Sequence, residues 1–145
     1  MKRMEKLSAI LIIIVALLSC TKNNHNRLIG SWLVDEAATE QNIMTSPQWS
    51  EMSTEEKAMF PEVISEMSIN MMITFTSKTI VTDMVGRISE VPYRISTASD
   101  SLFILQATTE NGDVQLTIRL FENGGMQFSS EANDDMTYYI WKKKS

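Results

Sequence analysis

Cys20 is the one cysteine of this 145-residue chain, and the residues before it give its thiol a specific chemistry. The four residues that end at Cys20 (LLSC) have the spacing of a bacterial lipobox, in which the small Ser19 lets a lipoprotein peptidase reach the scissile bond. A basic start at residues 2–6 and an uncharged apolar run at residues 7–18 precede this motif. We therefore expect cleavage before Cys20 and attachment of a lipid to its thiol.

The chain is predicted to contain a signal peptide, a tether and a single domain. The alternative for residues 7–18, a buried helix or a membrane span, is disfavoured because about 20 apolar residues are needed to cross a bilayer. Residues 1–19 are then the signal peptide, residues 20–27 a polar lipidated tether, and residues 28–145 one domain. The expected location is the cell envelope, on the outer membrane, with the head in the periplasm or at the cell surface.

The other chemistry-bearing residues do not assemble a catalytic site. His25 is the only histidine and lies in the predicted tether, so neither a Ser/His nucleophile inside the domain nor a histidine-based metal site is expected. Calcium at Asn133, Asp134 and Asp135 is an alternative, although no spaced loop of oxygen ligands surrounds these residues. We predict that the protein is not an enzyme and has no cofactor and no metal site.

The charge balance limits the partners. Removal of residues 1–19 takes away three of the 13 basic residues and one of the 18 acidic residues, which leaves ten basic and seventeen acidic residues. This excess of negative charge argues against nucleic acid, whose binding needs clustered Lys and Arg. It also predicts a head that stays clear of anionic lipid. With one cysteine there is no internal disulfide, so stability must come from the core.

Methionine is unusually frequent between residues 44 and 72. Thioethers bind Cu(I), so a periplasmic copper chaperone is one hypothesis, and an adaptable ligand surface is another. Met52, Met59 and Met67 repeat with the apolar positions of a predicted helix, which favours ordinary core packing.

The hydrophobic pattern predicts an all-β domain of eight strands. Short turn signals separate the apolar runs, so neighbouring strands should be antiparallel and should close into an up-and-down barrel without exposed edges. An open sheet or a two-sheet sandwich is the alternative. The strands are expected at about residues 28–36, 68–77, 79–86, 87–97, 101–109, 113–122, 125–131 and 135–143.

A helical insertion is predicted after the first strand, at about residues 47–67. Ser53 and Glu56 form a capping box at a helix start, and Pro61 predicts two short helices or one kinked helix. The insertion is expected to cap or flank the barrel with one apolar face. That face consists of Met52, Met59, Phe60, Val63 and Met67.

The predicted barrel interior is mostly bulky, which leaves room for packed side chains or for one small ligand. A void well below about 300 Å³ would favour a protein-interaction role over ligand binding. Residues 102–105 are apolar on both faces, so the helices of the insertion or a partner protein should cover the outer one. The interior positions are Met71, Ile73, Phe75, Val91, Tyr93, Ile95, Leu116, Ile118, Leu120, Met126, Phe128, Tyr138 and Ile140.

Gly30-Ser31-Trp32, in the first predicted strand, resembles the Gly-x-Trp start of the lipocalins, and more closely the lipocalin-like domains of Gram-negative lipoproteins. The resemblance implies a lipocalin-like barrel in which Gly30 bends the first strand and Trp32 plugs one end beneath a basic residue of the last strand. That cation would be one of the lysines at residues 142–144, stacked on the indole.

These features predict a membrane-anchored, lipocalin-like binding module for a small apolar molecule or peptide. The alternative is a protein-interaction or structural envelope lipoprotein with a filled barrel, such as an inhibitor or an assembly accessory. The expected partners are the membrane, through the lipid on Cys20, and either an apolar ligand or an envelope protein. The candidate ligand-binding residues are Trp49, Met52, Met59 and Phe60 from the insertion and Tyr93 and Tyr138 from the wall.

Overall fold

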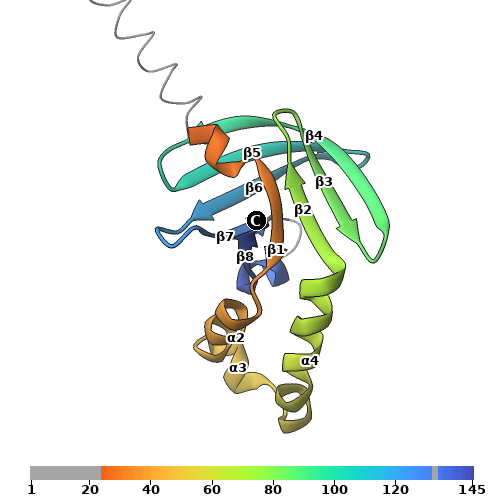
Figure 1. The fold of residues 1–145 in the computed structure, drawn as a ribbon, viewed down its shortest axis with the longest axis vertical. Coiled ribbons are helices and arrows are strands. Elements are labelled where there is room, and N and C mark those ends of the chain that lie inside the picture. Colours follow the sequence, from red (N-terminus) through yellow and green to blue (C-terminus); the bar gives the residue numbers. More distant parts are fainter. Residues whose placement is uncertain (1–23, 132–133) are drawn as a thin grey trace, which may run out of the picture.

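A computed structural model describes residues 24–131 and 134–145, which form an eight-stranded barrel with helices at one end (Figure 1). Each strand pairs antiparallel with its neighbours in sequence, and β8 pairs with β1, which closes the barrel. The predicted all-β up-and-down barrel with a helical insertion is confirmed, and the open sheet and the sandwich are wrong. The strands are β1 (Gly30–Val34), β2 (Met71–Phe75), β3 (Thr79–Met84), β4 (Arg87–Ala98), β5 (Leu102–Thr109), β6 (Gly112–Leu120), β7 (Gly125–Ser130) and β8 (Ile140–Lys143).

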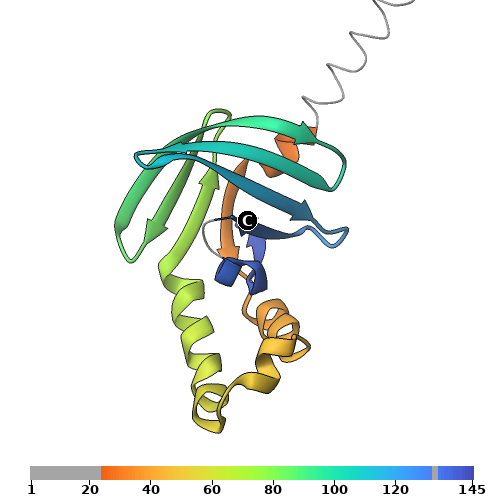
Figure 2. The same cartoon turned by 180° about the vertical axis from the view of Figure 1, so that it is seen from behind.

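The barrel has two different ends, here named the tether end and the mouth end. The tether end comprises a helical turn at residues 24–28, the β2–β3, β4–β5 and β6–β7 turns, and residues 142–144 at the end of β8. The mouth end comprises the β3–β4 and β5–β6 turns and four helices. Figures 1 and 2 show the helical turn and the α-helices at opposite ends of the molecule. These helices are α2 (Glu36–Met44), α3 (Pro47–Glu51), α4 (Thr54–Asn70) and the 3-10 helix η1 (Asp134–Tyr138).

Strands β1, β2 and β8 are shorter than predicted, and β2 begins at Met71 rather than residue 68 because α4 extends to Asn70. β1 begins at Gly30 rather than residue 28, because residues 24–28 form the helical turn, which ends at the fully buried Leu28. β8 begins at Ile140 rather than residue 135, because η1 precedes it.

Several predictions from the sequence concern residues that the structure does not describe. The signal peptide, the lipobox and Cys20 belong to residues 1–23 and lie outside the described residues. The calcium alternative includes Asn133, which also lies outside them.

The register of β8 differs from the prediction by one residue. Trp141 pairs with Met126, whose side chain is on the inner face, and the Trp141 ring lies 5.5 Å from that of Phe128. Ile140, predicted to face the interior, therefore faces outward, and Trp141 takes the inner position. Tyr138, which was predicted to face the interior from the same strand, lies in η1 instead. Apolar residues occupy both faces here because α2 covers the outer one, so alternation alone could not set the register.

Buried hydrogen bonds attach α2 to the outer face of β8. The Thr39 hydroxyl donates to the Ile140 carbonyl (3.2 Å) and accepts the Ile140 N–H (2.9 Å), and it is fully buried. The Asn42 amide donates to the Tyr138 carbonyl at 2.9 Å. Helix α2 contacts β8, α4 contacts β1 and β2, and η1 contacts β7. They therefore do not provide the cover predicted for the outer face of β5, where residues 102 and 104 are half-buried.

The helical insertion begins at Glu36, earlier than predicted, and is divided into α2, α3 and α4. The capping box at the start of α4 is confirmed: the Glu56 N–H donates to the Ser53 hydroxyl at 3.2 Å, and the Ser53 N–H donates to the Glu56 carboxylate at 2.7 Å. These bonds hold the pKa of Glu56 below its usual value. Pro61 lies inside α4, and the break between α3 and α4 falls at residue 52.

The buried face of α4 is rotated from the predicted one. Phe60 and Ile64 are 8% and 2% exposed, whereas Met59 and Val63 are 60% and 42% exposed. Residues spaced by four lie on one face of a helix. The row of Phe60 and Ile64 therefore faces α2 and β1, and the row of Met59 and Val63 faces solvent. The predicted burial of Met59 and Val63 is wrong.

Val85 adopts a strained conformation in the β3–β4 turn, with φ 55°, and Gly86 follows with φ 78°. Two consecutive positive φ values favour Asn-Gly, and a β-branched residue is disfavoured there. Because Val85 is 74% exposed, burial does not compensate for the strain. We expect Val85→Asn to raise the free energy of unfolding by about 1 kcal/mol in urea titrations. Ile88→Asn, on the same exposed hairpin, is the control and should not stabilise; equal effects of both variants would contradict the strain.

Candidate ligand cavity

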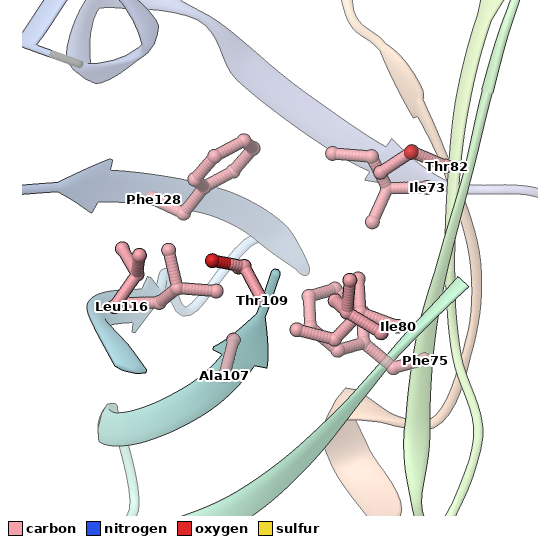
Figure 3. Close-up of a pocket in the computed structure, with 10 residues that line it drawn as sticks. Ile73, Phe75, Ile80, Thr82, Ala107, Thr109, Leu116 and Phe128 are labelled. Atoms are coloured by element: carbon pink, nitrogen blue, oxygen red, sulfur yellow. The ribbon is translucent and has the colours of Figure 1, made fainter. Parts of the chain in front are cut away.

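The barrel interior holds a partly open apolar cavity of about 210 Å³. Figure 3 shows side chains from opposite walls around one space, with Leu116 and Phe128 across from Ile73 and Ile80. Strands β2 to β7 all contribute to it. The residues that line the cavity are Ile73, Phe75, Ile80, Thr82, Val91, Ala107, Thr109, Val114, Leu116 and Phe128.

Strand alternation and register place these side chains on the inner face. Ile80 is directly opposite Val91, and Ala107 is directly opposite Val114. Directly paired residues share a face of a sheet, and residues two apart on one strand do so as well. Once one pair on a hairpin is known to face inward, strand alternation therefore determines which other residues of that hairpin face inward.

The lining can recognise a ligand mainly by burial of apolar surface. Eight of the ten residues are apolar, and the remaining two are Thr82 and Thr109. The Thr109 hydroxyl donates to the Gly112 carbonyl at 2.8 Å in the β5–β6 turn. The lining has no charged side chain, so an ionised ligand group would lose its hydration inside without compensation.

The volume limits the ligand to a small molecule. An apolar cavity of about 150 Å³ holds benzene, while pockets for drug-sized ligands start near 300 Å³. The present cavity, at about 210 Å³, lies between these values. It fits a molecule somewhat larger than benzene, or the end of a longer apolar chain.

The cavity extends toward an apolar rim at the mouth end. Thr82 lines the cavity and also lines a second hollow, of about 670 Å³, on the β3–β4 hairpin. Met84, Val85 and Ile88 of this hairpin are exposed. An apolar molecule that enters from the mouth end would contact this rim first.

Trp32 closes the tether end below the cavity. It is 2% exposed, and its Nε1–H donates to the Leu28 carbonyl at 2.9 Å. Lys143 Nζ lies 5.5 Å from the centre of the Trp32 ring, so Lys143 is the cation over the indole. Gly30 has φ +131°, and a Cβ there would lie 2.8 Å from Lys143 Cε, so this position requires glycine.

His25 packs against the barrel rather than lying in a free tether. Its Nε2 is 2.6 Å from the Tyr93 hydroxyl, which itself donates to the Thr76 carbonyl at 2.6 Å. Since the tyrosine proton is used in the second bond, Nε2 of His25 is the donor in the first. Burial raises the pKa of Tyr93 to about 12 and lowers the pKa of His25. The pair holds the helical turn against the tether end.

The six predicted ligand-binding residues lie elsewhere. Trp49 and Phe60 pack edge to face, 5.8 Å between ring centres, and Lys57 Nζ lies 5.5 Å from the centre of the Trp49 ring. Met52 is half-buried beside them, and Met59 is exposed to solvent. Tyr93 is at the tether end and Tyr138 is in η1. None of the six lines the cavity, and their role in ligand binding stays a prediction.

The described residues form neither a metal-binding cluster nor a membrane-spanning helix. No three His, Cys, Asp or Glu side chains come together as metal ligands within residues 24–131 and 134–145. In the same part of the chain, no helix has the length and apolar composition of a membrane span. The comparison with known proteins found no family model, curated protein or solved structure that matches the chain.

Proposed function

We propose that this protein is an envelope lipoprotein whose barrel binds one small, uncharged apolar molecule. The observation that carries the proposal is the apolar cavity of about 210 Å³ inside a closed barrel. The sequence supports the lipid anchor through the lipobox that ends at Cys20. The anchor would keep the binding module at the membrane without a membrane-spanning segment.

The size of the cavity predicts the affinity. A ligand of ten carbon atoms that gains about 0.6 kcal/mol per heavy atom would bind with a Kd of about 40 μM. Naphthalene is a rigid probe of this size and has no polar group that would need a partner. Its binding should be accompanied by a negative heat-capacity change, because apolar surface is removed from water.

We expect Ala107→Phe to weaken naphthalene binding at least about tenfold, as measured by isothermal titration calorimetry. Ala107 is buried and lines the cavity, so the added ring would occupy the ligand's space without forcing packed neighbours apart. The matched control is Ile104→Phe, which adds a ring on the outer face of the same strand. Equal binding by the wild-type chain and both variants, or no binding by the wild-type chain, would contradict the proposal.

The second candidate is a protein-interaction role. It is favoured by the exposed apolar rim of Met84, Val85 and Ile88 and by a cavity smaller than those of drug-sized ligands. In that case Ile88→Asn would weaken capture of an envelope partner, and Ala107→Phe would not.

A further inference from the structure

We propose that the tether end is a membrane-contact surface that binds anionic lipid headgroups, so that the mouth end points away from the bilayer. The inference goes beyond ligand binding, and it rests on the proposed lipid anchor, which would hold the barrel at the membrane. Three observations carry it: where the chain leaves the barrel, how the charges are distributed, and a hollow that combines cations with an apolar floor.

The chain leaves the barrel at the tether end. His25 contacts Tyr93, Lys143 Nζ donates to the Arg27 carbonyl at 3.1 Å, and the Arg27 guanidinium donates to the Asp100 carbonyl. These contacts fix residues 24–28 against the barrel. Cys20 precedes Asn24 by four residues, which span at most about 14 Å. A lipid on Cys20 would therefore bring the tether end within contact distance of the membrane surface.

Basic side chains gather at this same end, although the chain as a whole is acidic. The tether end carries two acidic residues, Asp100 and Glu122, in its turns. Helices α2 to α4, at the opposite end, carry seven acidic residues and one basic residue. The exposed basic residues of the tether end are Arg27, Lys78, Lys142, Lys143 and Lys144.

A hollow at the tether end combines positive charge with apolar surface. Its volume is about 210 Å³, and Arg27 and Lys143 line it together with Trp32, Leu120 and Phe121. A guanidinium has five N–H donors, so Arg27 can bind a phosphate while it keeps its bond to the Asp100 carbonyl. A phospholipid headgroup offers a phosphate next to glycerol and acyl carbons, which matches this combination.

The separation of charge explains why the acidic helices do not prevent such contact. The five residues of β1 rise about 17 Å in total and lie between the tether end and α2. The Debye length is about 8 Å at physiological ionic strength, so the membrane is screened from the acidic helices more than from the tether end. The expectation that the head stays clear of anionic lipid followed from net charge alone, which does not show this separation.

The test uses the mature chain from residue 20 with Cys20→Ser, and vesicles that differ in one lipid. We expect cosedimentation with phosphatidylcholine vesicles that contain phosphatidylglycerol, and not with vesicles of phosphatidylcholine alone. Lys78→Glu with Lys144→Glu should weaken this binding at least about tenfold. The matched control, Lys57→Glu with Arg87→Glu, makes the same charge change at the mouth end and should bind more tightly than the tether-end double variant.

The results separate this inference from the lipid anchor. Equal behaviour of the two vesicle types, including binding to neither, would overturn the inference, as would equal losses in the two double variants. Because the chain used carries no lipid, these outcomes do not depend on whether Cys20 is acylated. If the native chain proves not to be acylated while the basic surface binds anionic vesicles, the anchor is wrong and the surface assignment stands.

Discussion

Trp32→Ala is expected to lower the free energy of unfolding by about 3–5 kcal/mol. Trp32 is buried at the tether end, where its Nε1–H donates to the Leu28 carbonyl and Lys143 lies over its ring. The substitution leaves a cavity, frees the lysine and removes the bond that holds the helical turn. A loss of this size is a large share of the stability of one domain.

Trp49→Ala is the matched control for Trp32→Ala. Trp49 packs on Phe60 and Lys57 in the helical insertion and is half-buried, so its removal should cost less than about 2 kcal/mol. Urea titrations followed by circular dichroism would measure both variants. A loss below about 1 kcal/mol for Trp32→Ala, or equal losses for the two variants, would contradict the role of Trp32 as the plug of the tether end.

Cys20→Ala is expected to abolish lipid attachment and to leave an unprocessed precursor. The chain has no other cysteine, so no second thiol can accept the lipid. Expression in a Gram-negative host, followed by detergent phase partition and intact mass measurement, would give the processing state and the acyl mass directly. Thr21→Ala, next to Cys20, is the control and should be processed and acylated as we expect for the wild-type chain. A processed Cys20→Ala chain that still enters the detergent phase would show that the anchor is elsewhere.

Most of the barrel was predictable from the sequence, because short turns and period-two alternation act within single hairpins. β5 and β6, for example, begin and end within a residue or two of the predicted bounds. The errors fall where distant segments decide the structure. The outer face of β8 is covered by α2 through Thr39, about a hundred residues away, so both Ile140 and Trp141 are buried and the alternation is lost.

The candidate site was predictable only in part. Ile73, Phe75, Val91, Leu116 and Phe128 were expected in the interior and do line the cavity. Ile80, Thr82, Ala107, Thr109 and Val114 were missed, although their two-residue spacing along β3, β5 and β6 was the available signal. Whether a cavity is present depends on which side chains meet across the barrel.

The contact between His25 and Tyr93 illustrates the same limit. The two residues are 68 positions apart, and nothing near His25 in the sequence indicates a partner. A polar segment with one histidine is typical of a tether, and residues 24–28 form a docked helical turn only because the barrel offers Tyr93 and Lys143 as partners.

Methyl NMR of the chain during titration with naphthalene would show directly whether the barrel interior is the ligand site. We expect the methyl signals of Ile73, Ile80 and Leu116 to shift in a saturable way, while those of Met52 and Met59 in the helical insertion stay in place. Shifts confined to the two methionines, or no saturable shift of any methyl, would contradict a ligand site in the barrel interior.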